Sequence, residues 1–188
     1  MLKSTLNTRA ILPGSLRFVR SDVPDKITEQ ETEWLVRENI TTIVDLRAEE
    51  ERERRKCPLA GDNRFRYLCM SVTGGNVVPP SVDDVSKSYI HMVDEQMETI
   101  ISAIQKAETN VLYFCNAGKD RTGVVSAILL SHMGMDEAYI VADYMKSKEN
   151  LRHVLVEYAK QCPEVDIQVI TPQERYMQEF LEWMKKKE

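Results

Sequence analysis

The chain has 188 residues, a length that suits one domain or a domain with a small appendage. Hydrophobic residues make up 43% and charged residues 29%, a balance typical of a soluble globular protein. Its 30 acidic side chains outnumber 25 basic ones, and the net charge of −5 argues against general binding of nucleic acid or anionic membranes. The longest strongly apolar stretch, residues 124–130, is too short for a membrane span, and the N-terminus lacks the apolar region of a signal peptide. We therefore expect neither a nucleic-acid partner nor integral membrane association.

The first half of the chain predicts strands that alternate with helices. A strand or hairpin is expected at residues 9–19 around Pro13-Gly14, and a helix after the capping box of Thr28 and Glu31. Buried strands are expected at 41–46 and 65–72. Residues 47–56 carry nine charges in ten positions, which is typical of a solvated helical face. After a loop at 73–80, Ser81 with Asp84 predicts the start of a helix that runs toward residue 107.

The second half predicts one strand and then only helices. A short apolar strand at 111–115 precedes a helix at 123–132 that is apolar nearly all round, with Gly134 placed to end it. Further helices are expected at 136–147 and 150–161, and a last one from Thr171-Pro172 to Met184. This order predicts an α/β fold with a mostly parallel central sheet flanked by helices, and with residues 136–161 as a candidate helical lobe or lid.

Cysteine and histidine usage indicates no metal site. The four cysteines, at positions 57, 69, 115 and 162, include no Cys-x-x-Cys pair for zinc or thioredoxin-type chemistry. The three histidines are too scattered to form a metal site. We expect a cytoplasmic protein with mainly reduced cysteines and with no metal or other cofactor.

One segment carries the strongest functional signal. The nine residues CNAGKDRTG, from Cys115 to Gly123, join the last predicted strand to the apolar helix, where open α/β sheets bind ligands. Unpaired N–H groups at a helix N-terminus, curled around one point, form an anion-binding nest, and Gly118 permits the backbone that such a curl needs. Arg121 adds a planar fork for two phosphate oxygens, and Lys119 a second positive charge. The predicted substrate-binding residues are Asn116, Ala117, Gly118, Lys119 and Thr122.

Cys115 is the candidate nucleophile at the base of this ring. Nearby cations and a helix N-terminus favour the thiolate, so we predict a thiolate at neutral pH that attacks the phosphorus of a bound monoester in line. Water would then hydrolyse the cysteinyl-phosphate, with the Thr122 hydroxyl easing the departure of sulfur. Arg121 and the amides neutralise the transferring group without a metal. The competing interpretation is an inert buried cysteine beside a helix start.

The segment resembles the signature loop of the cysteine-dependent protein tyrosine phosphatases, and most closely the bacterial and fungal branch whose loop reads C-x-A-G-K-D-R-T-G. Residues 14–17, 20–21, 43–47 and 142–145 also resemble segments of that branch. One departure is Phe114, because the family usually has histidine before the cysteine. The resemblance implies a tyrosine-phosphatase-like fold in which residues 1–188 form a single phosphatase domain.

Three aspartates are candidates for the general acid that protonates the leaving group. The resemblance favours Asp120, within the loop. Asp45, at the end of a neighbouring strand, either faces the same pocket or forms a salt bridge with Arg47 or Arg121. Asp83 lies at a distance from the cysteine that resembles dual-specificity phosphatases, with helix capping as its other interpretation.

The sequence thus predicts a phosphatase that acts on phosphate monoesters, with phosphotyrosine in a phosphorylated protein as the first substrate. Because Lys119 adds a cation, the resemblance also leaves a phosphoinositide or inositol phosphate as an alternative substrate. A third interpretation is a phosphate-binding pseudoenzyme that serves as an interaction module, although every loop residue needed for chemistry is present. A final hypothesis pairs oxidised Cys115 with Cys57 or Cys69 in a disulfide.

Overall fold

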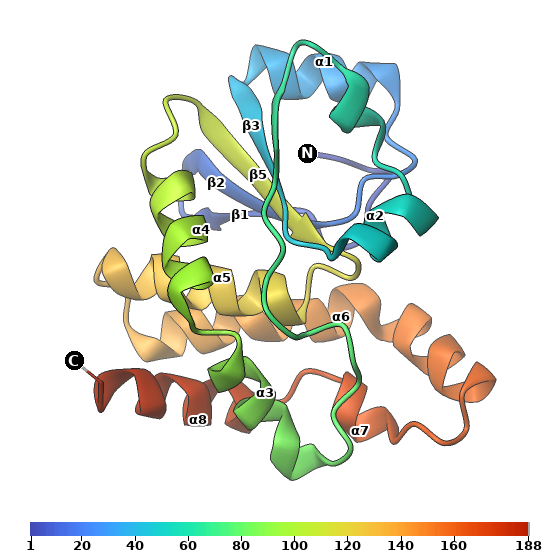
Figure 1. Ribbon diagram of the computed structural model, residues 1–188, viewed down its shortest axis with the longest axis vertical. Coiled ribbons are helices and arrows are strands. Elements are labelled where there is room, and N and C mark those ends of the chain that lie inside the picture. Colours follow the sequence, from blue (N-terminus) through green and yellow to red (C-terminus); the bar gives the residue numbers. More distant parts are fainter. Residues whose placement is uncertain (188) are drawn as a thin grey trace.

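A five-stranded sheet forms the centre of the computed structural model, which describes residues 1–187 (Figure 1). The strands lie in the order β1-β2-β5-β3-β4, with β1 antiparallel to β2 and the other neighbours parallel. Their bounds are β1 (Arg9–Leu12), β2 (Ser15–Asp22), β3 (Ile40–Asp45), β4 (Arg66–Cys69) and β5 (Asn110–Cys115). The predicted α/β fold with a mostly parallel sheet is confirmed.

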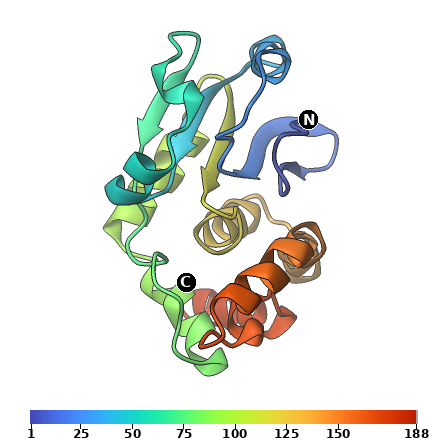
Figure 2. The ribbon, with the colours of Figure 1, turned by 90° about the vertical axis from the view of Figure 1, so that its right-hand side faces the viewer.

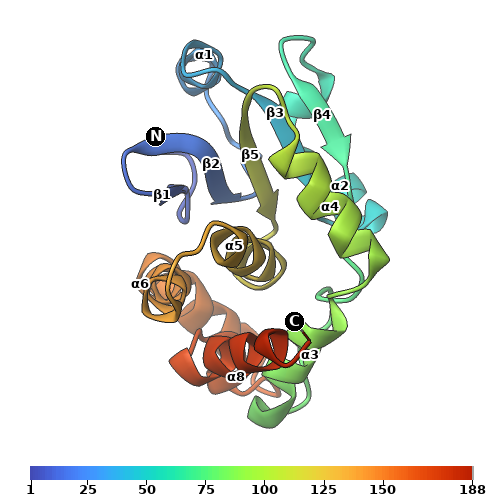
Figure 3. The same cartoon turned by 90° about the vertical axis from the view of Figure 1, so that its left-hand side faces the viewer.

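Helices cover both faces of the sheet (Figures 2 and 3). On one face lies α1, which begins at the predicted capping box of Thr28 and Glu31. On the other face α5 lies between the sheet and a second layer that contains α3, α6 and α8 (Figure 3). The helices are α1 (Glu29–Arg37), α2 (Glu49–Arg54), α3 (Val85–His91), α4 (Glu95–Gln105), α5 (Asp120–His132), α6 (Glu137–Gln161), α7 (Ile167–Ile170) and α8 (Glu174–Lys185), with 3-10 turns η1 (Pro58–Gly61) and η2 (Val82–Asp84).

Strand β5 is apolar from Val111 to Cys115, because helices cover both faces of the sheet. Successive side chains of a strand point to opposite faces. Tyr113 and Cys115 accordingly join the core on the α5 side, whereas Leu112 and Phe114 join the core on the α1 side. This alternation directs the thiol of Cys115 toward the start of α5.

The structure divides one predicted helix and joins two others. The helix expected from Ser81 toward residue 107 is broken, and α4 starts at a new N-cap, where Asp94 accepts a hydrogen bond from the backbone of Met97. The Ser81 hydroxyl donates a hydrogen bond to the Asp84 carboxylate, and it makes no capping hydrogen bond with the helix backbone. The helices expected at 136–147 and 150–161 are one continuous helix, α6, which buries Ser147 and Leu151 on either side of the expected break.

Helix α5 begins three residues earlier than predicted, so Asp120, Arg121 and Thr122 form its first turn. Helix α6 packs on α5, and its buried residues Ile140 and Tyr144 belong to the same core as the sheet. Within residues 1–187, no helix combines the length and the apolar character that crossing a membrane requires.

Candidate active site

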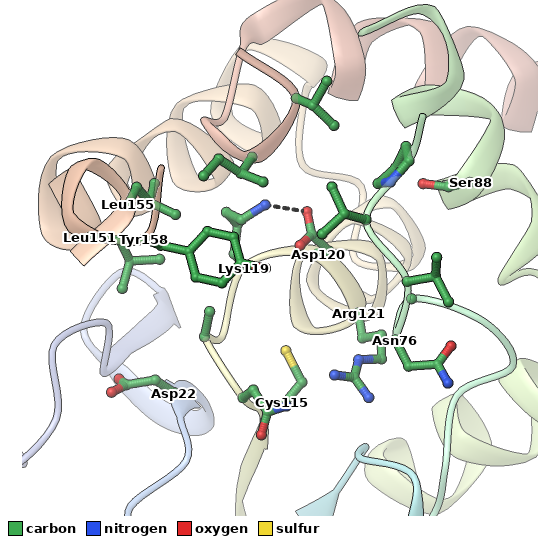
Figure 4. A pocket seen from close by; sticks show the side chains of 18 of the residues that line it. Asp22, Asn76, Ser88, Cys115, Lys119, Asp120, Arg121, Leu151, Leu155 and Tyr158 are labelled. Carbon is green, nitrogen blue, oxygen red and sulfur yellow. Dashed lines mark hydrogen bonds and ion pairs between the residues drawn. The ribbon is translucent and has the colours of Figure 1, made fainter. Parts of the chain in front are cut away.

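A pocket of about 540 Å³ opens at the carboxyl end of β5. The loop after β5 forms its base, loop 75–79 and α3 line one side, and the second half of α6 lines the other (Figure 4). Ligands of open α/β sheets bind at this edge, where the carboxyl ends of parallel strands meet. Six of the predicted site residues line the pocket together: Cys115, Asn116, Ala117, Lys119, Asp120 and Arg121.

The loop after Cys115 is held from behind by side chains that donate to its carbonyl groups. Asn7 Nδ2 lies 2.8 Å from the carbonyl oxygen of Gly118 and 3.2 Å from that of Ala117. Arg20 Nη2 lies 2.8 Å from the same oxygen of Gly118. In a trans peptide unit the C=O and N–H bonds point in opposite directions. Bonds to these carbonyls therefore direct the N–H groups of the same peptide units away from Asn7 and Arg20, toward the pocket.

A buried ion-pair cluster orients these donors. Asp143 of α6 is 2% exposed, and its carboxylate lies 2.8 Å from Arg9 Nε and 2.7 Å from Arg20 Nη1. Burial would raise the pKa of Asp143, but the charges of Arg20 and Arg9 outweigh it and hold that pKa below its usual value. Removing one member would leave buried charge without a partner. The cluster therefore ties β1, β2 and α6 to the back of the loop.

Sequence reasoning missed the roles of this cluster. Arg20 and Asp143 both lie in segments that resemble the phosphatase branch, and this was the available signal. No local pattern marks Asn7 or Arg9, because their partners are distant in sequence.

Cys115 is buried at the base of the pocket, with 3% of its surface exposed. The Thr122 hydroxyl donates to its sulfur, with Oγ1 and Sγ 3.1 Å apart. Phe114, which stands where the family usually has histidine, is buried in the opposite core, and its ring centroid lies 5.4 Å from the guanidinium carbon of Arg47. The thiol therefore receives its hydrogen bond from the first turn of α5 rather than from the preceding residue.

Arg121 keeps an unpartnered donor nitrogen after its side chain pairs with Glu51. Two of its nitrogens bond the carboxylate of Glu51, with 2.8 Å between Nη2 and Oε1. Its Nε is buried and has no hydrogen-bond partner within residues 1–187. A buried N–H without a partner is costly, and a phosphate oxygen bound above Cys115 would satisfy it.

Glu51 is a site residue that sequence reasoning missed. It stands in the charged run at 47–56, and α2 otherwise presents no buried residue, as the predicted solvated face requires. The Glu51 side chain is only 16% exposed and also accepts a hydrogen bond from Asn116 Nδ2, 2.5 Å away. Partial burial would raise the pKa of Glu51, but the bonds and charge of Arg121 outweigh it and lower that pKa. Glu51 thus holds Arg121 in place as a carboxylate.

Asp120 is the acidic side chain of the loop that the structure places in the pocket. Tyr89 Oη and Lys119 Nζ both donate to its Oδ1, at 2.6 and 2.7 Å. Tyr89 is buried, and its hydroxyl also lies 2.8 Å from that of Tyr144. Burial would raise the pKa of Asp120, but Lys119 and the Tyr89 hydroxyl outweigh it and lower that pKa. Because both partners bond Oδ1, Oδ2 is the oxygen with room for a proton.

The other two candidate acids lie outside the pocket. Asp45 is fully buried, and its carboxylate bonds Arg47 Nε at 2.9 Å and Nη2 at 2.7 Å, with Tyr67 Oη 2.6 Å away. The structure thus contains the salt bridge between Asp45 and Arg47 that was one of the two interpretations of this residue, and it places Asp45 outside the pocket lining. The Asp83 side chain is 78% exposed and lies 3.3 Å from Arg175 of α8. Neither carboxylate reaches the pocket.

The structure also separates the cysteines that were candidates for a disulfide. All four are unpaired. Cys57 belongs to the core on the α1 side of the sheet, opposite Cys115, and burial raises the pKa of its thiol to about 11. Cys69 ends β4, with β3 between it and β5.

Within residues 1–187, no three His, Cys, Asp or Glu side chains gather in a way that could hold a metal ion.

Replacing Gly118 with alanine should unfold the loop and destabilise the protein by roughly 2–4 kcal/mol. The φ angle of Gly118 is +64°, and an added Cβ would lie 2.3 Å from the carbonyl oxygen of Ser21. Gly134→Ala is the matched control, because its φ is +73° but the added Cβ meets nothing within 4 Å. Urea unfolding should show a smaller loss for Gly134→Ala, limited to the conformational cost. Equal losses in the two variants would contradict the close contact.

The arrangement brings a buried thiol, an unpartnered arginine nitrogen and the loop that precedes α5 together at one pocket, as a phosphate-binding site requires. A family model described as the tyrosine phosphatase family matches residues 5–188 of the chain. The chain belongs to the tyrosine phosphatase family. The resemblance seen in the loop thus extends over nearly the whole sequence.

Curated relatives agree with this membership. A tyrosine-protein phosphatase of Nostoc commune is 27% identical over 144 residues, which are 71% of this chain and 49% of that protein. The triple specificity protein phosphatase PtpB of Mycobacterium tuberculosis is 51% identical over 41 residues, 22% of this chain and 15% of that protein. The chain thus spans about half the length of the first of these relatives, and less of the second.

Among solved structures, the human tyrosine phosphatase-like serine/threonine/tyrosine-interacting protein aligns with a TM-score of 0.47 and 18% identity, covering 95% of each chain. P. aeruginosa TpbA aligns with a TM-score of 0.44 and 19% identity, over 76% of this chain and 79% of its own.

Proposed function

We propose that the chain hydrolyses phosphate monoesters, with phosphotyrosine in a protein as the substrate, through a cysteinyl-phosphate intermediate. The observation that carries this proposal is the buried Cys115 thiol beneath a pocket into which the unpartnered Nε of Arg121 is available as a donor. We further propose that the 188 residues act as one phosphatase domain.

In the first step the Cys115 thiolate attacks phosphorus, and the bond from phosphorus to the ester oxygen breaks. The loop amides of residues 116–120 and Arg121 Nε–H stabilise the charge on the three equatorial oxygens. Asp120 is the acid that gives its proton to the leaving oxygen, with Oδ2 as the donor atom. Lys119 and Tyr89 hold Asp120 through Oδ1 and are positioning residues.

In the second step water attacks the phosphorus of the cysteinyl-phosphate and releases inorganic phosphate. Asp120, now a carboxylate, takes a proton from that water. The Thr122 hydroxyl, 3.1 Å from Sγ, stabilises the thiolate that leaves. Every group in both steps belongs to this chain, so the reaction needs no cofactor of its own.

The pocket favours a phosphotyrosine over a polyphosphorylated inositol. The positive charge of Lys119 is the feature that favours an inositol phosphate, but its ammonium forms an ion pair with Asp120, with Nζ 2.7 Å from Oδ1. Arg121 is likewise bonded to Glu51. A ligand with several phosphates needs cations beyond those that bind the first phosphate, and the pocket offers little uncompensated charge.

We also propose a cytoplasmic location, supported by four unpaired cysteines in a protein whose nucleophile must stay reduced.

The test is release of inorganic phosphate by the purified chain in the presence of a chelator. We expect turnover of p-nitrophenyl phosphate and of a phosphotyrosyl peptide. A phosphoserine peptide and vesicles that contain a phosphoinositide complete the panel. If the protein hydrolyses neither p-nitrophenyl phosphate nor the phosphotyrosyl peptide, the proposal is overturned. If it prefers the phosphoinositide in vesicles to the phosphotyrosyl peptide, the lipid replaces phosphotyrosine as the proposed substrate.

A further inference from the structure

Half of the large exposed apolar side chains within residues 1–187 surround one opening. Ten large apolar side chains are exposed within residues 1–187, and five of them line the pocket above Cys115. Scattered exposed apolar residues are normal, whereas a group that surrounds one opening marks a binding surface. We name these five side chains the apolar rim: Leu6, Val77, Val78, Val154 and Tyr158.

The apolar rim comes from three separate parts of the chain. Val154 and Tyr158 lie on the second half of α6, which projects from the rest of the fold (Figure 1). Tyr158 lies on the α6 side in Figure 4, with Asn76 of the loop that carries Val77 and Val78 on the other side. Buried Leu151 and Leu155 extend the same apolar wall down toward the base.

The charged groups around the opening do not favour a polyanion. Asp22 and Glu51 contribute carboxylates to the pocket lining. Burial raises the pKa of Asp22, although hydrogen bonds from three backbone N–H groups oppose that rise. Arg55 also lines the pocket, but its guanidinium lies 3.0 Å from Asp25. The chain has a net charge of −5, which disfavours an anionic lipid surface.

We propose that the apolar rim binds apolar side chains adjacent to the phosphotyrosine of a protein substrate. The proposal rests on the proposed function, because the phosphate bound above Cys115 brings the flanking residues to the opening. Apolar side chains of the residues that flank the phosphotyrosine would pack against Val154 and Val77 and be buried from water. Burial of apolar surface then adds to kcat/KM only for substrates with apolar flanks.

The decisive experiment compares two valines on one helix. Val154 lines the pocket and is 43% exposed, whereas Val156 is 38% exposed and does not line it. Two phosphotyrosyl peptides are needed, identical except that the residues flanking phosphotyrosine are leucine and valine in one and serine in the other. The readout is the ratio of their kcat/KM values, measured within each variant so that a general folding defect cancels.

We expect the wild type to prefer the apolar-flanked peptide by roughly tenfold, and Val154→Ser to reduce that preference by about fivefold. Val156→Ser should keep the wild-type preference. A wild type that hydrolyses both peptides equally, or a preference that both variants retain, would overturn the role of the apolar rim.

Further arms separate this inference from the proposed function. If wild type fails on p-nitrophenyl phosphate, the proposed function itself is wrong. If Val154→Ser lowers hydrolysis of a phosphoinositide in vesicles and leaves the peptide ratio unchanged, the apolar rim contacts a lipid surface and the peptide proposal is wrong.

Discussion

Replacing Cys115 with serine should lower the turnover of p-nitrophenyl phosphate by roughly 10⁴-fold or more, because an alcohol at this position is not ionised at neutral pH and is a far weaker nucleophile. The site should still bind inorganic phosphate, since Arg121 Nε and the loop amides are unchanged. Initial rates measure the first effect. A rise in melting temperature with added phosphate measures the second.

Cys162→Ser provides the matched control for this experiment. Cys162 is half-buried after the end of α6 and does not line the pocket. This variant should keep the wild-type rate. Turnover of Cys115→Ser within tenfold of the wild type would contradict the cysteine mechanism, and loss of phosphate binding together with turnover would show that the variant had lost its loop.

Replacing Asp120 with asparagine should separate substrates by their leaving groups. Phenyl phosphate releases a basic phenolate that needs a proton, so its kcat should fall by about 10²- to 10³-fold. p-Nitrophenyl phosphate releases a weakly basic anion and should be much less affected. The variant therefore steepens the dependence of kcat on leaving-group basicity, which a series of substituted phenyl phosphates measures.

The pH dependence of the wild type carries the same signature. Asp120 can donate a proton only below its pKa, and Lys119 and Tyr89 hold that pKa below its usual value in the free protein. The kcat/KM for phenyl phosphate should therefore fall as the pH rises through the acidic range. Tyr89→Phe removes one hydrogen bond to the carboxylate, which raises the pKa and should move this fall to higher pH.

Asp83→Asn is the control for the acid. Its side chain is 78% exposed and lies outside the pocket, so neither leaving-group dependence nor pH profile should change. If Asp120→Asn keeps its full rate with phenyl phosphate while Asp83→Asn loses it, the acid has been assigned to the wrong residue.

Local sequence determined the loop at 115–123 and its surroundings. Strand β5, the loop and α5 are consecutive, so the pattern of an apolar strand, glycine and an apolar helix already placed Cys115 and Arg121 at a strand-to-helix junction. The Thr122 hydroxyl is seven positions from Cys115, and contact between them follows from the first helical turn. The order of strands and helices likewise predicted a mostly parallel sheet, because parallel neighbours need long connections.

Only the tertiary structure decided which distant side chains complete the site. Glu51 is 70 positions from Arg121, and Arg20 is 123 positions from Asp143. Such pairs depend on the packing of β2, α2 and α6 around the loop, which no local pattern encodes. Asp45 shows that a position next to the pocket in the strand order is not sufficient for a site residue. Its strand ends beside the pocket, but Arg47 and Tyr67 donate hydrogen bonds to its carboxylate.

Composition alone does not distinguish the four cysteines of this acidic chain from one another. Sequence alone distinguished Cys115, because the chemistry of the loop lies in nine consecutive residues. It also indicated that the net charge of −5 does not oppose a small anion, since a charge is felt mainly within a Debye length. The contacts that hold Asp120 and the exposure of the apolar rim required the fold, because burial and long-range contacts set the proton affinity of a carboxylate and the exposure of a valine.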